Sequence, residues 1–278
     1  MKGNGTLHLK DFLYGLITGV TTTIPGVSFG TLAMLFNIYE KFINAFSPEN
    51  IKKSIGFLVT FFVGCGCSLF LFSRLVTYLI SEYQTAMYFA FIGMIIGCVP
   101  MIYKRAEYEK VKPRNVLIFA VALVFMALLA FINDSSLGNR TLDEFAGNAL
   151  FLFLWFFVSG FAASLAMIIP GLSGSIIILM LGTYAATLEA VATLNFLVLA
   201  PFGVGVAVGI FAGIKLVKIL LNRHYQASYS AILGLILGSI FIIYPGFTFG
   251  TQGLVAIILA VVCGVLTYIF SKAGGSKG

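Results

Sequence analysis

Six long apolar stretches constrain the fold of this chain more than any other feature. A helix needs roughly 20 mainly apolar residues to cross a bilayer, and each of these stretches is close to or above that length: Ser54–Ile80, Ala86–Tyr103, Asn115–Ile132, Leu197–Leu221, Ser228–Tyr244 and Leu254–Phe270. Of the 278 residues, 60% are hydrophobic and only 10% are charged, whereas soluble proteins carry about 25% charged residues. We therefore expect an all-α integral membrane protein.

Two further apolar segments are each interrupted by an Ile-Pro-Gly sequence. Phe12–Phe46 contains Pro25-Gly26, and Leu150–Leu194 contains Pro170-Gly171. Proline removes a backbone donor and glycine frees the backbone, so a helix stops at such a point. We interpret both segments as helical hairpins that turn inside the membrane. The first arm of the first hairpin is predicted to have about 13 residues, too few to cross at 1.5 Å per residue. Its counterpart is long enough, which leaves open whether the hairpins are re-entrant or full pairs of spans.

The chain also contains an internal repeat. An offset of 145 residues relates Gly15 to Gly160, Pro25-Gly26 to Pro170-Gly171 and Tyr39 to Tyr184, and an offset of 141 then relates the following helices, with Gly93 and Gly97 matching Gly234 and Gly238. We predict a first repeat at 1–135 and a second at 136–278, each a Pro-Gly-broken hairpin plus three transmembrane helices. An odd number of crossings per copy requires the second copy to run upside down, which gives two inverted-topology repeats of a kind common in transporters.

The distribution of charge predicts the orientation. Lysines and arginines such as Lys52, Lys53, Lys104, Arg105 and Arg223 fall on one side of the predicted spans, whereas Glu82, Asp134, Asp143 and Glu144 fall on the other. The positive-inside rule therefore places both termini in the cytoplasm. The basic residues are scattered between apolar runs, so nucleic acid is not an expected partner. No small-x-small cleavage site follows the first apolar stretch, so we expect no removable signal peptide.

The two hairpin tips are the best candidates for a binding site. After each Pro-Gly, a serine stands where an N-cap would begin the second arm, and the first N–H groups of such a helix favour an anion, typically a phosphate or a carboxylate. The glycines would let a bulky head group approach the backbone. If the two tips converge in the interior, the predicted substrate-binding residues are Thr23, Pro25, Gly26, Ser28, Gly30 and Thr31 from the first and Pro170, Gly171, Ser173, Gly174 and Ser175 from the second.

Two cations complete the candidate set. Arg74 and Lys215 lie well inside apolar stretches and occupy matching repeat positions. They either snorkel to an interface or hold an anionic head group at the two mouths of a pathway, for which a guanidinium suits phosphate well. The four cysteines, Cys65, Cys67, Cys98 and Cys263, lie in apolar segments without metal-ligand spacing. We expect no metal, no cofactor and no catalytic residues.

The residues around both tips resemble the DUF368 family of bacterial membrane proteins, the polyprenyl-phosphate transporters. The shared pattern is a glycine-led helix, Ile-Pro-Gly-Val-Ser, a small-residue step and an apolar helix that ends near a tyrosine, which corresponds here to Gly15–Tyr39 and again to Gly160–Tyr184. Phe29 and Asn37 depart from the small residues usual in the family. The resemblance implies a flippase of the cell membrane that returns undecaprenyl phosphate, the lipid carrier of cell-wall synthesis, from the outer to the inner leaflet.

Two alternative functions remain at this stage. One is a membrane enzyme resembling undecaprenyl-pyrophosphate phosphatases, which have similar tips; however, their tips continue Arg-Ser and pair with a Glu-x3-Glu sequence, whereas Phe29 and Gly174 follow the two serines here and none of the predicted spans contains such a pair of glutamates. The other is a transporter or channel for a small soluble anion. The coupling ion and the oligomeric state stay open, a homodimer being one option.

Overall fold

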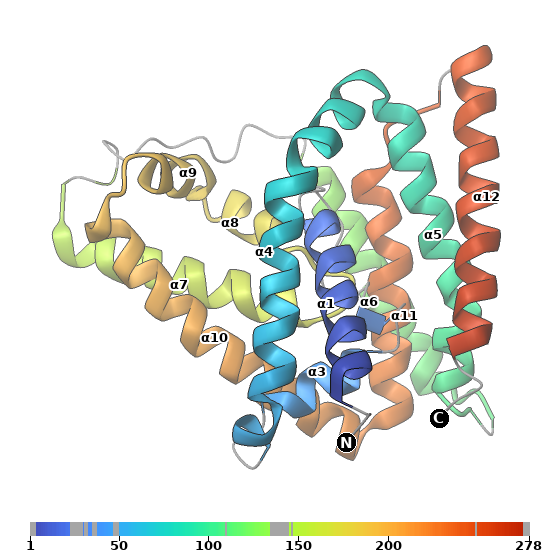
Figure 1. Ribbon diagram of the computed structural model, residues 1–278, viewed down its shortest axis with the longest axis horizontal. Coiled ribbons are helices and arrows are strands. Elements are labelled where there is room, and N and C mark those ends of the chain that lie inside the picture. Colours follow the sequence, from blue (N-terminus) through green and yellow to red (C-terminus); the bar gives the residue numbers. More distant parts are fainter. Residues whose placement is uncertain are drawn as a thin grey trace. The chain divides into compact units, whose positions relative to one another are not determined.

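The computed structural model describes residues 4–22, 30, 33–34, 38–46, 50–108, 110–133, 145, 147–247 and 249–274 (Figure 1). Every regular element that these residues form is a helix. The bounds are α1 Asn4–Thr22, α3 Tyr39–Ala45, α4 Ile51–Glu82, α5 Gln84–Arg105, α6 Pro113–Asn133, α7 Ala149–Ile168, α8 Gly174–Met180, α9 Tyr184–Ala192, α10 Phe196–Arg223, α11 Tyr225–Ile243 and α12 Thr251–Gly274.

Among the described residues, seven helices are long and apolar enough to cross a membrane: α4, α5, α6, α7, α10, α11 and α12. The six stretches predicted from the sequence are confirmed; each helix extends a few residues beyond its predicted ends, except that α11 ends at Ile243, one residue before its predicted end. The first arm is longer than predicted, since α1 has 19 residues, but α1 is not among the described helices that are long and apolar enough to cross. The helix continues through the polar residues of Asn4–Lys10, which an estimate based on apolar length excludes.

The chain divides into two compact units. Unit 1 comprises Met1–Lys110 and Ile243–Gly278 and therefore holds α1, α3, α4, α5 and α12, whereas unit 2 comprises Val111–Ile242 and holds α6–α11. This division differs from a cut between the predicted repeats. The last helix of the first predicted repeat, α6, belongs to unit 2, and the last helix of the second, α12, belongs to unit 1.

In unit 2, a glycine seam joins α7 and α10, which lie side by side (Figure 1). A Cβ on Gly160 would collide with the Phe202 carbonyl oxygen, and one on Gly205 would collide with that of Phe157. Gly213 lies further along, against Ile168. Residue numbers rise together on both helices, so the helices run parallel. The segment between them must therefore bring the chain back to the side from which α7 began, and 169–195 is a returning hairpin arm.

The same packing occurs between α1 and α4 in unit 1. Gly15 lies against the Phe61 backbone and Gly19 against the Cys65 backbone, so these two helices are also close and parallel. Small residues at such contacts let helix backbones approach closely in a membrane protein.

Two more close pairs involve α5 and α11. Gly93 of α5 lies against Ala260 of α12, and Gly97 lies against Gly264. In unit 2, Gly234 of α11 lies against the Phe119 backbone of α6. A methyl group added at Gly93 would overlap the Ala260 carbonyl oxygen, and one added at Gly234 would overlap the Phe119 carbonyl oxygen.

The returning arm of the second hairpin is broken into α8 and α9, and the break lies near Tyr184, where the family pattern ends its apolar helix. α8 and α9 meet at a bend of 112°. Gly182 has a φ of 70°, its N–H donates to the Leu179 carbonyl, and the Thr183 N–H donates to the Ile178 carbonyl. This is a Schellman motif, which ends α8 after seven residues. The Trp155 indole donates to the Leu181 carbonyl at 3.2 Å and fixes the break against α7.

Candidate functional site

The tip of hairpin 2 is a tight turn between α7 and α8. α7 ends before Ile169, whose backbone is extended, and the Leu172 N–H donates to the Ile169 carbonyl at 3.2 Å. Gly171 has a φ of 91°, and a Cβ there would lie 2.6 Å from the Leu235 carbonyl carbon. Only glycine satisfies both the left-handed backbone and this contact with α11. The Pro-Gly break predicted at this position is thus present and fits against α11.

Two serine hydroxyls form the polar part of this tip. Ser173 is the N-cap residue of α8, as predicted, but its side chain makes no capping hydrogen bond. Its Oγ instead lies 2.7 Å from the Ser175 Oγ, and Ser173 is only 9% exposed. Hydroxyls can rotate to donate to an incoming acceptor. The pair therefore places two hydrogen-bonding groups at the start of a helix, next to Gly174.

Apolar side chains hold this tip in place. Ile169, Leu172 and Met180 pack against a buried cluster that includes Met126 of α6 and Leu235 of α11. A polar turn is therefore supported on an apolar base, and the orientation of its serines is fixed by α6, α7 and α11 together.

The first tip lies mostly outside the described residues. Of its predicted site residues, Thr23, Pro25, Gly26, Ser28 and Thr31 are not described. Gly30 is described; it is helical and buried, and it corresponds to Ser175 at the offset of 145 residues. The convergence of the two tips stays a prediction.

The two cations are placed differently from the tip serines. Arg74 lies within α4, but its side chain is outside the described parts of the chain. Lys215 is exposed on α10. Gly213 faces the end of α7, and two further residues turn a helix by about 200°, so Lys215 lies on the side of α10 opposite the seam. A direct role for Lys215 in binding stays a prediction.

A charged group that the sequence analysis did not single out lies at the base of hairpin 1. Asp11 of α1 pairs with Lys41 of α3, the Lys41 Nζ lying 2.6 Å from the Asp11 Oδ1. The sequence does contain a signal for this pair. The offset of 145 residues relates Asp11 to Phe156 and Lys41 to Ala186, so the two positions are charged in the first repeat and apolar in the second. Within the described residues, no three His, Cys, Asp or Glu side chains gather in a way that could hold a metal ion.

Comparisons with known proteins agree with the tip pattern. A family model described as undecaprenyl phosphate translocase-like matches residues 18–253. A polyprenyl-phosphate transporter of Staphylococcus aureus is 28% identical over 246 residues, which cover 85% of this chain and 86% of that protein. A polyprenyl-phosphate transporter of Vibrio cholerae is 28% identical over 261 residues, 88% of this chain and 80% of that protein. No solved structure matches.

Proposed function

Because the chain belongs to the undecaprenyl phosphate translocase-like family, we propose that this multi-pass membrane protein returns undecaprenyl phosphate from the outer to the inner leaflet of the cell membrane. The observation that carries the proposal is the part-buried Ser173–Ser175 hydroxyl pair at a helix break. Hydroxyls and helix N–H groups at the turn of a hairpin can bind a phosphate head group. The apolar exterior of the helices leaves the polyprenyl tail in lipid.

The physical difficulty of this reaction is the charge of the head group. A phosphate monoester carries about 1.5 to 2 negative charges at neutral pH. Transferring an ion of this kind into hydrocarbon costs on the order of tens of kcal/mol when nothing replaces its hydration. Broken helices inside a bundle offer backbone and hydroxyl donors at depth without exposing unpaired groups to lipid. The hairpin tip has this arrangement, with polar donors supported by apolar packing on α6 and α11.

The two predicted inverted repeats form part of this proposal, and matching contacts in the two units support the repeat. The contact of Gly15 with Phe61 and that of Gly160 with Phe202 fall at equivalent positions. The contact of Gly93 with Ala260 has its equivalent in that of Gly234 with Phe119.

One matching contact even exchanges its partners. Gly19 lies against the Ser68 hydroxyl in unit 1, whereas in unit 2 the serine is on the first helix, Ser164, and the glycine is on the second, Gly209. At this contact each unit has one glycine and one serine. If each copy of the repeat must keep one glycine where its two helices meet, the glycine can lie on either helix. This requirement explains the exchange.

In the proposed cycle, the head group binds at the hairpin tips from the outer side, and the site then opens inward. Both termini are cytoplasmic, in agreement with the positive-inside distribution of the loops. The parallel packing of α7 and α10 requires that the second hairpin return to its starting side, a condition that a re-entrant loop and a full pair of spans both meet.

At the second tip, the hydrogen bonding of the serine does not favour the alternative function of a phosphatase. Ser173 has a second hydroxyl as its hydrogen-bond partner rather than a general base, and nucleophilic catalysis needs a base or another means of activation. The two relatives are named as transporters.

The test is a leaflet-sidedness assay in proteoliposomes loaded with undecaprenyl phosphate. We expect Ser173→Ala and Ser175→Ala to slow the translocation of the lipid at least about tenfold, the effect of losing one or two hydrogen bonds to a charged group. Ser81→Ala is the matched control, because its hydroxyl is exposed and donates only to the nearby Tyr78 carbonyl. Ser28→Ala and Arg74→Ala extend the test to the residues predicted from sequence. Normal rates in all of these variants would remove the tip from the mechanism, and a wild-type protein that moves no lipid would remove the function.

A further inference from the structure

The ion pair at the base of hairpin 1 is held from three helices. The Asp11 side chain of α1 is 7% exposed, whereas the Lys41 side chain of α3 is 47% exposed. The Lys41 Nζ lies 4.0 Å from the centroid of the Phe57 ring of α4. The ammonium is thus fixed by a buried carboxylate and an aromatic face, while roughly half of its side chain remains accessible.

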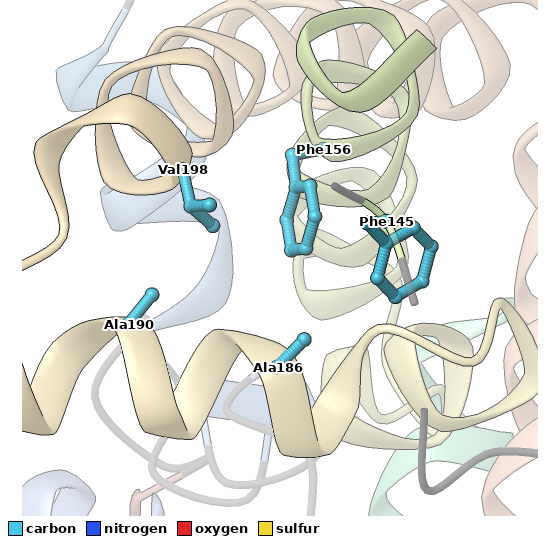
Figure 2. Packing of buried hydrophobic residues seen from close by; sticks show 5 residues of the cluster. All are labelled: Phe145, Phe156, Ala186, Ala190 and Val198. Carbon is cyan, nitrogen blue, oxygen red and sulfur yellow. The ribbon is translucent and has the colours of Figure 1, made fainter. Parts of the chain in front are cut away.

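The equivalent position in unit 2 has no charge. The repeat offsets relate Asp11 to Phe156 and Lys41 to Ala186, and relate Phe57 to Val198. Phe156, Ala186 and Val198 belong to one buried apolar cluster with Ala190 and Phe145. Figure 2 shows their side chains gathered from α7, α9, α10 and from Phe145, which precedes α7 in the chain. The same junction of helices is therefore filled in unit 2 without any ion pair.

Stability does not account for the charges in unit 1. Because the Lys41 side chain is 47% exposed, its attraction to Asp11 is screened by solvent, and pairs of this kind contribute little to stability. Unit 2 has apolar residues instead. The charge itself therefore needs an explanation, and a half-exposed ammonium held against a buried carboxylate is a suitable group for binding an anion.

The geometry indicates what such a role requires. Lysine has three donors, and only one is needed for the Asp11 Oδ1. The half-exposed ammonium is oriented in advance, so its rotamer entropy is already lost when a ligand arrives. Lys10 of α1 and Lys52 and Lys53 at the beginning of α4 are exposed, and these three cations outnumber Glu40, the exposed acidic residue next to Lys41. Asp11 is a counter-ion that compensates Lys41 when no ligand is present, which suits a site that must release its ligand.

We propose that Lys41, positioned by Asp11 and Phe57, contacts the phosphate of a polyprenyl phosphate at the base of hairpin 1. The inference rests on the proposed function, and it adds a second head-group contact at the end of unit 1 where α1 and α4 begin, apart from the hairpin tips. The cation remains with Asp11 when the lipid is absent and shares its charge with the phosphate when the lipid is present.

The decisive variant transfers the residues of unit 2 into unit 1: Asp11→Phe, Lys41→Ala and Phe57→Val together. Binding of a polyprenyl monophosphate to the purified protein in detergent is measured, with the uncharged polyprenol of equal length as the control ligand. We expect the triple variant to keep a wild-type thermal transition and to lose about tenfold or more in affinity for the monophosphate, the contribution of one charge-assisted hydrogen bond. Wild-type affinity in this variant would overturn the inference.

A second variant separates a ligand contact from a structural clamp. Exchanging the charges, Asp11→Lys with Lys41→Asp, preserves the pair but moves the cation to the buried position. We expect the exchange to leave binding as weak as in the triple variant, and restored affinity would overturn the inference by showing that only the pairing matters. If the triple variant does not fold, the double variant Asp11→Asn with Lys41→Gln replaces it. This variant also removes both charges, and we expect the same loss of affinity for the monophosphate.

Competition with inorganic phosphate distinguishes a lipid head group from free phosphate as the anion that binds. We expect it to compete with the lipid only at far higher concentration, because it lacks the tail, and equal affinity would overturn the assignment to a lipid head group. A wild-type protein that binds no polyprenyl phosphate would refute the proposed function itself, whereas a wild-type protein and a triple variant that bind equally well would refute only the role of Lys41.

Discussion

A methyl group added at Gly205 tests whether the close approach of α7 and α10 stabilises unit 2. The Gly205 Cβ would collide with the Phe157 carbonyl oxygen and lie 2.9 Å from the Phe161 nitrogen. Gly203 is on the same helix, is exposed, and has no atom within 4 Å of the position that its Cβ would occupy. Gly203→Ala is therefore the matched control for Gly205→Ala.

The difference between these two variants isolates the helix contact. Replacing glycine by alanine inside a helix stabilises it by about 0.5–1 kcal/mol, and this gain is common to both. Overpacking a close contact costs about 1–3 kcal/mol, and this cost applies only at Gly205, where the obstructing atoms belong to the backbone. Gly205→Ala should thus be less stable than Gly203→Ala by about 1–3 kcal/mol.

The free energy of unfolding is measured by titration with sodium dodecyl sulfate in mixed micelles, following helix content. Equal midpoints for the two variants would refute the packing argument. Unit 1 supplies an independent repetition, since Gly64 lies against the Phe12 carbonyl whereas Gly66 has no neighbouring atom within 4 Å. The Gly64→Ala and Gly66→Ala pair should differ in the same direction.

The other predictions use the same preparations. Gly171→Ala should destabilise the protein more than Gly246→Ala, because both glycines have a positive φ but only Gly171 has backbone atoms close to its Cβ position. Equal losses of stability in the detergent titration would show that the strained φ explains the whole effect and that the close contact adds nothing. Trp155→Phe should cost about 1 kcal/mol, since it removes the hydrogen bond to the Leu181 carbonyl, and an unchanged midpoint would contradict that bond's role. Purified protein incubated with undecaprenyl pyrophosphate should release no phosphate, and sustained release over many turnovers would identify an enzyme.

The membrane spans were predictable from the sequence because hydropathy acts locally and over about 20 residues. The ends of α4, α5 and α12 therefore lie within a few residues of the predicted ones. α1 was underestimated for the same reason, since its polar first turns are helical without being apolar. The break between α8 and α9 depends on Gly182 in a left-handed conformation, and one glycine within an apolar run does not reveal whether it will end a helix.

The site could be predicted only in part. Pro170-Gly171 indicated the turn and Ser173 indicated the cap position, because both are signals of local backbone geometry. The hydrogen bond between Ser173 and Ser175 replaces the expected cap, and this choice depends on how α6 and α11 hold the turn. Asp11 and Lys41 are 30 positions apart on different helices, so their pairing has no periodic signal.

The packing of α12 against α5 has a consequence for the synthesis of this protein. Gly93 and Gly97 meet Ala260 and Gly264, which the ribosome adds more than 160 residues later. Until α12 is synthesised, the glycine face of α5 has no packing partner. Unit 1 therefore cannot complete its folding while the chain is still being made. Loss of the last helix by a premature stop codon would therefore uncover the glycine face of α5, a helix made much earlier, and a quality-control protease should recognise the truncated product by the exposure of that face.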